Sequence, residues 1–333
     1  MEISKELGKG AYGSVYEVKG NSAYALKKLD LNDSDMIRSM LIEIVVMKLV
    51  DHPNIMKCKG YNFSNGSIEF YMIKYPISLL DYLQNLRQKK IYLDTKIINK
   101  MLMDVLNGLD YLHTNNILHL DLSDDNILLD SNYNCVITDF GLSDIEYKKE
   151  LFTNGRKQKF PVIKNPFAPP EVLEESYYNS KADIWSFGVL MSKMFSFRYI
   201  FKNLDSRSKQ LYHLEKNFFG LEDKERTNFL IQSFLPRGVD HTNVYVSKSE
   251  VTITHLNILD KIFRKDMDER PTTKDIMEYL NFYEWIWDCR KYENNFHINP
   301  LRSFLLSSLN NNLMVNQLKD VIGQIKEIGT KSS

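Results

Sequence analysis

Residues 119–126 read HLDLSDDN and residues 139–141 read DFG, so Asp139 follows Asp121 by eighteen positions. The octet places three aspartates and one asparagine within six consecutive positions. This spacing of acidic and amide side chains is the strongest sign in the chain of a site for chemistry.

The length and composition are typical of a globular protein with a large core. The chain has 333 residues, 43% hydrophobic and 26% charged, which suits one two-lobed or two-domain protein. Lysine and arginine together number 43, as do aspartate and glutamate, so no overall charge favours a polyanion. We therefore expect no nucleic-acid partner and no membrane partner.

The cysteines and the N-terminal sequence bear on the cellular compartment. Cys58, Cys135 and Cys289 lie far apart, with no CxxC or Cys/His spacing, and such a sparse, odd set favours a reducing compartment. The first residues contain no apolar signal-like segment, and no run approaches the roughly 18 apolar residues of a membrane helix. We expect a cytoplasmic, intracellular location.

The first 75 residues have the pattern of short strands and turns. Strands are predicted at 3–7, 15–18, 23–29, 56–61 and 68–73. One helix is predicted between the third and fourth strands, ended by His52-Pro53-Asn54. Its N-cap candidates are Asp33, Ser34 and Asp35. Its apolar stripe consists of Met40, Ile44, Met47 and Val50.

After Tyr75-Pro76 the pattern becomes helical. One core helix is predicted from the helical spacing of Leu102, Val105, Leu106, Leu109 and Leu112. A second is predicted over 181–197, and 202–250 is expected to hold short helices and loops. The chain therefore divides into a small sheet-rich lobe and a larger helical lobe.

Residues 8–15 form a GxGxxG loop, in which glycine lets backbone N–H groups approach phosphates. By itself the motif is equally compatible with an ordinary glycine turn. A dinucleotide-binding interpretation, with Asp30 downstream, requires a helix to begin at the third glycine. The β-rich segment 14–18 continues instead, which favours a loop between two strands.

Lys27 follows this loop in an apolar strand, and Glu43 in the next helix is its expected partner. A lysine so placed can reach nucleotide phosphates when a carboxylate holds it. Taken alone, the two residues are better interpreted as a solvated strand lysine and a helix-surface glutamate.

Together these motifs resemble the eukaryotic protein kinases of Ser/Thr type, from about Leu7 to Leu280. The family's motifs occur in order: the glycine loop, Lys27, Glu43, HLDLSDDN, DFG, Pro169-Pro170-Glu171, Asp183-Ile184-Trp185-Ser186-Phe187-Gly188 and Arg270-Pro271. The resemblance implies an α+β bilobal fold. It consists of a small antiparallel sheet lobe with one helix (1–75), a larger, mostly α-helical lobe (76–284) and a C-terminal helical extension (285–333).

The resemblance also implies a role for each matching residue, with ATP and Mg²⁺ as cofactors and a protein as substrate. Asp121 would accept the proton of the attacking hydroxyl, and Asn126 and Asp139 would hold Mg²⁺. Lys27 and Glu43 would position the α- and β-phosphates.

Further matching residues are expected to build the nucleotide site and its support. Glu171 and Arg270 should form a buried ion pair, and Asp183 should brace the catalytic-loop backbone. Met72 falls at the gatekeeper position, and residues 73–75 would bind adenine through their backbone. The expected nucleotide-binding residues, besides Lys27 and Glu43, are Leu7, Gly8, Lys9, Gly10, Ala11, Tyr12, Gly13, Ser14, Val15, Ala25, Ile73, Tyr75 and Leu128.

Two departures concern positions where the family carries basic residues. Leu120 replaces the arginine that pairs with a phosphorylated activation segment, and Lys159 occupies the phosphosite of the cyclin-dependent group. We therefore expect activity without activation-segment phosphorylation, with Thr153, Ser143 and Tyr147 as other acceptors.

Ser123 replaces the lysine that contacts the γ-phosphate. Its uncompensated loss would slow transfer by about 10- to 100-fold. Lys164, seven residues before Glu171, stands where the family has threonine. It is the candidate substitute cation, the alternative being an exposed loop lysine.

Within the family, the chain is most similar to the cyclin-dependent kinase-like group. The evidence is the spacing from Glu43 to His52-Pro53-Asn54 and the segment 210–220. That similarity implies a cyclin-like or other activating subunit, although Ser39-Met40-Leu41-Ile42-Glu43 departs from the group's helix signature. The alternative function is a nucleotide-binding pseudokinase acting as a weakly active scaffold.

The C-terminal segment 285–333 lies beyond the resemblance. A short amphipathic stripe recurs there at helical spacing, formed by Val315, Leu318, Ile322 and Ile325. Such a stripe packs on its own domain or recruits a partner helix.

Overall fold

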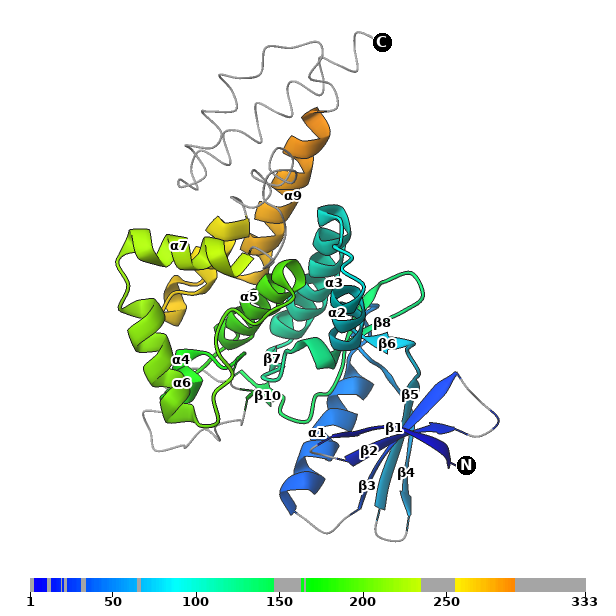
Figure 1. The fold of residues 1–333 in the computed structure, drawn as a ribbon. Helices are drawn as coiled ribbons and strands as arrows, with labels where there is room; N and C mark the ends of the chain where they lie inside the picture. The colour runs from blue at the N-terminus through cyan, green and yellow to red at the C-terminus, as the bar shows by residue number, and fades with distance from the viewer. Residues whose placement is uncertain are drawn as a thin grey trace. The chain divides into compact units, whose positions relative to one another are not determined.

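The computed structural model describes residues 3–10, 13–18, 20, 23–30, 34–64, 67–146, 163–164, 166–234 and 255–290 (Figure 1). The chain divides into two compact units, Met1–Leu280 and Asn281–Ser333. In the part of the chain that is described, no helix has the length and apolar character needed to cross a bilayer. The predicted tail stripe from Val315 to Ile325 lies outside the described residues.

A five-stranded antiparallel sheet begins the first unit, in the order β1-β2-β3-β5-β4. The strands are β1 (Ile3–Gly10), β2 (Gly13–Val18), β3 (Tyr24–Asp30), β4 (Cys58–Ser64) and β5 (Ser67–Ile73). Helix α1 (Ser34–Leu49) lies beside this sheet in Figure 1. The predicted stripe of Met40, Ile44, Met47 and Val50 is buried. The small sheet lobe with one helix is therefore present as predicted.

A larger, mostly helical lobe follows the sheet lobe. The two lobes together have the predicted bilobal protein kinase fold. Its helices are α2 (Leu79–Gln88), α3 (Thr95–Thr114), α4 (Pro170–Leu173), α5 (Lys181–Ser196), α6 (Arg207–Leu214), α7 (Asp223–Phe234) and α9 (Thr273–Arg290), with shorter helical turns η1 (Asp124–Asn126), η3 (Glu215–Phe219) and η5 (Met267–Glu269). Its short strands are β6 (Ile77–Ser78), β7 (Ile117–Leu118), β8 (Ile127–Leu129), β9 (Cys135–Ile137) and β10 (Asp144–Ile145).

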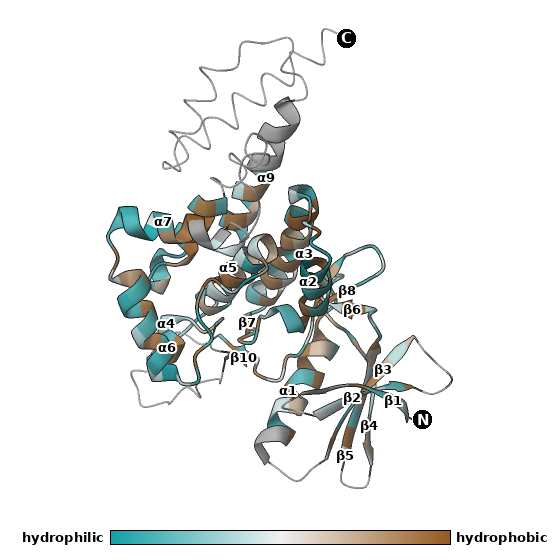
Figure 2. Ribbon diagram, viewed as in Figure 1, coloured by the Kyte–Doolittle hydropathy of each residue, from teal (hydrophilic) through white to brown (hydrophobic). Residues whose placement is uncertain are grey.

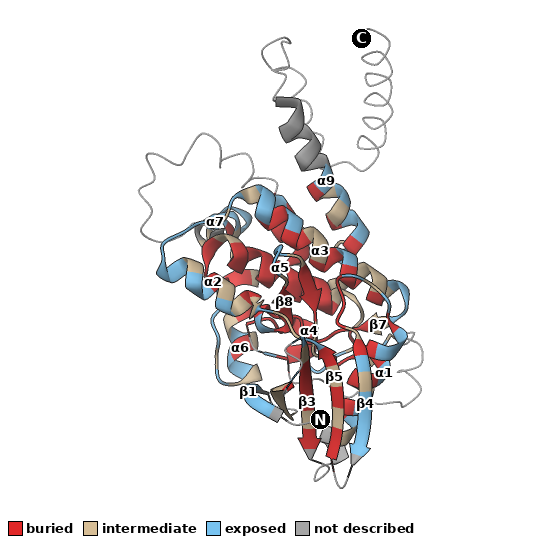
Figure 3. Ribbon diagram, turned by 90° about the vertical axis from the view of Figure 1, so that its right-hand side faces the viewer, coloured by how far each residue is buried: buried red, intermediate tan, exposed pale blue. Residues whose placement is uncertain are grey.

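Helices α3 and α5 form the centre of the helical lobe. Figure 2 shows hydrophobic residues gathered along both helices, and Figure 3 shows that the same helices are largely buried. All five residues of the predicted α3 face, from Leu102 to Leu112, have no exposed surface. Helix α5 ends one residue earlier than predicted, because Phe197 adopts a left-handed conformation (φ 57°) that closes the helix.

One strand prediction was wrong at its start. The strand predicted from residue 56 begins at Cys58, because the segment before it pairs with β9 of the larger lobe. The Met56 N–H donates to the Ile137 carbonyl at 2.8 Å, and the Ile137 N–H donates to the Asn54 carbonyl at 2.9 Å. The turn after α1 is therefore joined to the helical lobe.

Candidate active site

The segment from His119 to Asn126 connects β7 to β8, and a buried carboxylate fixes its backbone. Asp183 of α5 accepts hydrogen bonds from the His119 N–H (2.9 Å) and the Leu120 N–H (2.8 Å). Leu120 has a left-handed backbone (φ 62°), a conformation that costs energy for a non-glycine residue. The predicted bracing role of Asp183 is confirmed, and the leucine side chain is buried in the core.

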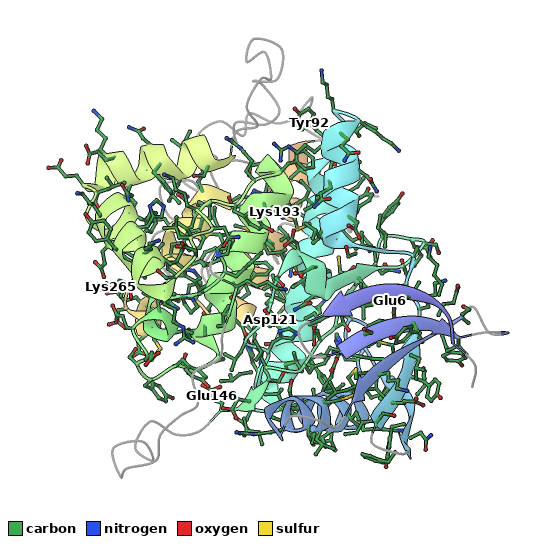
Figure 4. All side chains as sticks on the ribbon, turned by 60° about the horizontal axis from the view of Figure 1, so that its bottom comes forward. Glu6, Tyr92, Asp121, Glu146, Lys193 and Lys265 are labelled. Carbon is green, nitrogen blue, oxygen red and sulfur yellow. The ribbon has the colours of Figure 1, made fainter. Side chains whose placement is uncertain are left out.

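Asp121 lies near the centre of Figure 4, with the strands on one side and the helices on the other. The Asn126 side-chain amide donates to the Asp121 carbonyl and to Asp121 Oδ2, both at 2.8 Å. Burial raises the pKa of Asp121 to about 7, and this effect exceeds the opposing attraction of Lys164. The carboxyl therefore titrates near neutrality, as a general base requires.

Lys27, Glu43 and Asp139 form one cluster that joins β3, α1 and the DFG segment. Lys27 Nζ lies 2.6 Å from Glu43 Oε2 and 3.1 Å from Asp139 Oδ1. Burial by itself would lower the pKa of Lys27, but the two carboxylates raise it above its ordinary value. The predicted partnership of Lys27 with Glu43 is present, and the solvated interpretation of the pair was wrong.

The backbone conformation of Asp139 and the buried residue that follows it fix the position of the Asp139 side chain. Its backbone is left-handed (φ 64°), and Phe140 next to it is fully buried against the His119 ring. The His119 ring nitrogen Nε2 lies 3.0 Å from the Thr138 carbonyl. Burial opposes ionisation of Asp139, but the adjacent Lys27 ammonium keeps its pKa below the ordinary value. Asp139 is therefore ready to hold a cation as the carboxylate.

The side chains of Asn126 and Asp139 offer an amide oxygen and a carboxylate, the kinds of ligand atom that bind Mg²⁺. Mg²⁺ prefers oxygen ligands and commonly uses few protein ligands, with water and substrate phosphates completing the shell. The amide nitrogen of Asn126 is bonded to Asp121, which leaves its Oδ1 as the ligand atom. Among the residues described, no cluster of three or more acidic, histidine or cysteine side chains offers a cage for a metal. The residues thus fit a metal held partly by phosphate.

The predicted nucleotide residues are distributed over the strands around this cluster. Val15 pairs with Lys27, and Ala25 pairs with Met72 across the sheet. Gly13 has φ 131° and a Cβ there would lie 2.6 Å from the Lys28 carbonyl oxygen, so only glycine fits. Gly8 is on β1, Ser14 is on β2, Ile73 ends β5 and Leu128 is on β8. Leu7 is exposed on β1, and Tyr75 is partly buried just after β5. Ala11 and Tyr12 lie outside the described residues, and for Lys9 and Gly10 only the backbone, in β1, is described.

Lys164 lies beside the catalytic loop, the segment from His119 to Asn126, although it is 41 residues from Ser123 in sequence. Its Nζ donates to Ser123 Oγ at 3.0 Å and to both Asp125 carboxylate oxygens at 2.7 Å, and it lies 3.9 Å from Asp121 Oδ2. Ser123 Oγ also donates to Asp125 Oδ1 at 2.6 Å. The sequence analysis predicted that Lys164 lies near Ser123, but it did not predict that Asp125 pairs with Lys164. Nothing in the pattern of the octet distinguishes Asp125 as a partner for a lysine.

Two ion pairs anchor the loop and the segment that follows it. Arg270 donates to both Glu171 carboxylate oxygens at 2.7 Å, so the predicted buried pair is confirmed. A second buried pair, Lys193 with Asp124, was not predicted. The Lys193 ammonium also lies 3.8 Å from the centre of the Tyr199 ring. An aspartate in a polar octet gives no sign that it will be buried, so this pair is visible only in the fold.

These strands, helices and charged clusters are those of a protein kinase domain, and a family profile for the protein kinase domain matches residues 1–282. The chain belongs to the protein kinase domain family. Lys159, Thr153 and Tyr147, on which the phosphorylation argument depends, lie outside the described residues.

Known relatives include kinases named for different hydroxyl acceptors. A probable serine/threonine-protein kinase of Dictyostelium discoideum is 30% identical over 58% of this chain, and human tyrosine-protein kinase Fer is 36% identical over 58%. The matched regions are only 15% and 23% of the length of those two proteins. The probable serine/threonine-protein kinase PBL28 of Arabidopsis thaliana is 28% identical over 82% of this chain and 72% of its own length.

Proposed function

We propose that this chain transfers the γ-phosphoryl group of ATP to serine or threonine hydroxyls of proteins. The observation that supports this most is that Asn126 bonds to the Asp121 carboxylate at 2.8 Å and Lys27 pairs with Asp139 at 3.1 Å. The two pairs are adjacent, because the N–H of Thr138, next to Asp139, donates to the Asn126 carbonyl at 3.0 Å. Kinase catalysis needs little covalent chemistry from the protein, mainly positioning and charge stabilisation. A base, two metal ligands and a lysine fixed by a carboxylate would together supply the positioning and the charge stabilisation.

Each residue has a definite part in the transfer. Asp121 orients the substrate hydroxyl and accepts its proton, while Asn126 keeps the carboxylate in place through the hydrogen bonds described above. Asn126 Oδ1 and the Asp139 carboxylate would hold Mg²⁺, which neutralises charge on the phosphates when bound. Lys27, fixed by Glu43, would position the α- and β-phosphates.

Serine or threonine is the proposed acceptor because HLDLSDDN lacks the arginine-bearing loop that is typical of tyrosine kinases. The relatives named for serine/threonine activity agree with this, and the Fer tyrosine kinase is the relative that does not. None of the relatives described above is a cyclin-dependent kinase. The cyclin-like or other activating subunit therefore remains a prediction without added support.

We also propose that activity does not require activation-segment phosphorylation. Leu120 is 1% exposed and offers no cation to a phosphate. The Lys27–Glu43 pair, which activating phosphorylation controls in many kinases, is formed here at 2.6 Å. Cytoplasmic location and a protein substrate remain parts of the same proposal.

The experiment is a radiolabelled-ATP assay of the purified chain with a panel of generic protein substrates, followed by analysis of the labelled amino acids. Lys27→Met and Asp139→Ala should each abolish transfer, because the first loses phosphate positioning and the second loses a metal ligand. Asp121→Asn should lower transfer at least about a hundredfold, the range of general-base contributions. Full activity in any of the three would refute the assignment. Nucleotide binding without transfer by the unmodified chain would favour the pseudokinase alternative.

A further inference from the structure

The transition state of phosphoryl transfer needs positive charge on the acceptor side as well as on the nucleotide side. The transferred group spreads its negative charge over three oxygens, and preorganised cations in the site stabilise that charge. Lys27 serves the nucleotide side, where Glu43 and Asp139 hold its ammonium. Near Asp121, the catalytic loop carries Ser123 and Asp125, and neither is a cation. Asp124 is instead buried against Lys193.

The ammonium of Lys164 lies where such a charge is needed. Its Nζ is 3.9 Å from Asp121 Oδ2 and 3.0 Å from Ser123 Oγ. A hydroxyl within hydrogen-bond reach of Asp121 is about 2.6–3.2 Å from that carboxylate. The phosphoryl group that this hydroxyl attacks therefore comes within reach of Lys164.

The backbone places this lysine firmly. The Lys164 carbonyl accepts hydrogen bonds from the Phe167 N–H at 2.8 Å and the Ala168 N–H at 3.1 Å, and both of those residues are buried. Ile163 before it is buried as well. The side chain is 41% exposed, so it is accessible to a ligand although its amine is held by Ser123 and Asp125.

Stability does not account for this arrangement. The Asp125 side chain is also 41% exposed, and ion pairs between such exposed groups contribute little to stability. Both carboxylate oxygens of Asp125 accept hydrogen bonds from the Lys164 ammonium, and Asp125 Oδ1 also accepts one from Ser123 Oγ. Together Asp125 and Ser123 hold the ammonium beside Asp121 before any substrate is bound.

We propose that Lys164 is a catalytic cation that contacts the γ-phosphate during transfer, with Ser123 and Asp125 as its positioning residues. The proposal rests on the proposed kinase function. As the bond between the hydroxyl oxygen and the γ-phosphorus forms, the bond to the β,γ-bridging oxygen breaks, and ADP leaves with that electron pair. The hydroxyl proton goes to Asp121, and Lys164 keeps its protons and its charge throughout.

The test uses full-length protein and measures kcat and KM for ATP. Lys164→Thr should lower kcat by about tenfold or more, as expected for one lost contact to a charged group. Lys164→Arg should retain most of the activity, since it keeps the charge. Lys100→Thr is the matched control: Lys100 is 46% exposed and paired with Asp104 in α3, so its loss should not change kcat.

Three further variants distinguish a phosphate contact from a merely structural pair. If Lys164 acted only by holding Asp125, Asp125→Asn would copy the loss seen in Lys164→Thr. The proposal requires a clearly smaller loss. Ser123→Lys combined with Lys164→Thr should recover most of the lost activity, and Ser123→Lys alone should add little, because residues that share one ligand couple strongly. Equal losses in Lys164→Thr and Asp125→Asn would overturn the proposal.

Nucleotide binding provides a readout that does not depend on turnover. By calorimetry with Mg²⁺, Lys164→Thr should weaken binding of a non-hydrolysable ATP analogue several-fold while leaving ADP affinity unchanged. Unchanged affinity for both nucleotides, together with unchanged kcat, would make Lys164 an ordinary loop lysine. If Asp139→Ala still abolished transfer, the kinase assignment would stand without it.

Discussion

At the scale of single residues, burial and nearby lysines shift the pKa values of two aspartates of the site in opposite directions. Asp121 is the clearest case, since burial moves its pKa from 3.8 to about 7 and Lys164 opposes that shift. Asp139 is shifted in the other direction by Lys27. Two aspartates of one site are thus prepared for different tasks, one to accept a proton and one to hold a cation.

The raised pKa of Asp121 predicts the pH dependence of transfer. The base must be deprotonated, so kcat/KM should fall about tenfold per unit as the pH drops below about 7. Because Lys164 lowers the pKa of Asp121, Lys164→Thr should move this acid limb to higher pH. The measurement is kcat/KM from about pH 5.5 to 8.5 for both proteins. An acid limb that stays at the same pH in Lys164→Thr would assign it to another group.

At the scale of elements, α5 holds the catalytic loop at two points. Asp183 near its start binds the backbone at His119 and Leu120, and Lys193 near its end pairs with Asp124. The two residues are ten positions apart, about 15 Å along a helix. One helix therefore holds the loop on both sides of Asp121.

Breaking the second anchor should destabilise the protein strongly. The Lys193 and Asp124 side chains are 8% and 1% exposed, and burial lowers the pKa of Lys193 despite its partner. Lys193→Met would leave a buried carboxylate unpaired and should cost about 3–5 kcal/mol of unfolding free energy. Combining it with Asp124→Leu should restore most of that loss, because no buried charge then remains.

Urea denaturation of the two single variants and the double variant measures this effect. Lys209→Met is the control, since Lys209 and Asp205 form an exposed pair and its loss should change stability by less than about 1 kcal/mol. A loss of that small size in Lys193→Met would show that the buried pair does not anchor the loop.

At the scale of the first compact unit, direct contacts between the sheet lobe and the helical lobe join α1, β3 and the DFG segment. Lys27 of β3 reaches Asp139, and the Ser39 hydroxyl of α1 donates to the Gly141 carbonyl at 2.6 Å. The Met56 N–H joins the segment before β4 to Ile137 of β9. These contacts place α1 and the DFG segment in one arrangement.

Activity should therefore persist after complete dephosphorylation. Phosphatase treatment is expected to change kcat less than about twofold, because Leu120 supplies no charge for a phosphate to engage. Mass spectrometry before and after treatment verifies removal, with Thr153, Ser143 and Tyr147 as the sites to inspect. A tenfold loss of activity on dephosphorylation would contradict the prediction. It would indicate that a cation at a position other than 120 binds the phosphate.

The order of elements and the residues of the candidate site could be predicted from local patterns in the sequence. The hydrophobic stripes of α1 and α3, the glycine loop between two strands, and the motifs around Asp121 and Asp139 are local patterns, readable over a few residues. The Lys27–Glu43 and Glu171–Arg270 pairs also followed from motif positions. Each of these signals depends on spacing along the chain.

Two charge pairs could not be predicted from the sequence and are visible only once the chain is folded. Lys193 meets Asp124 across 69 residues and Lys164 meets Asp125 across 39, and no periodicity links such positions. Residue 56 has the pattern of a strand, yet it bonds to β9 because the chain passes between the lobes there. Burial and long-range pairing depend on how whole elements pack, and packing overrides local preference.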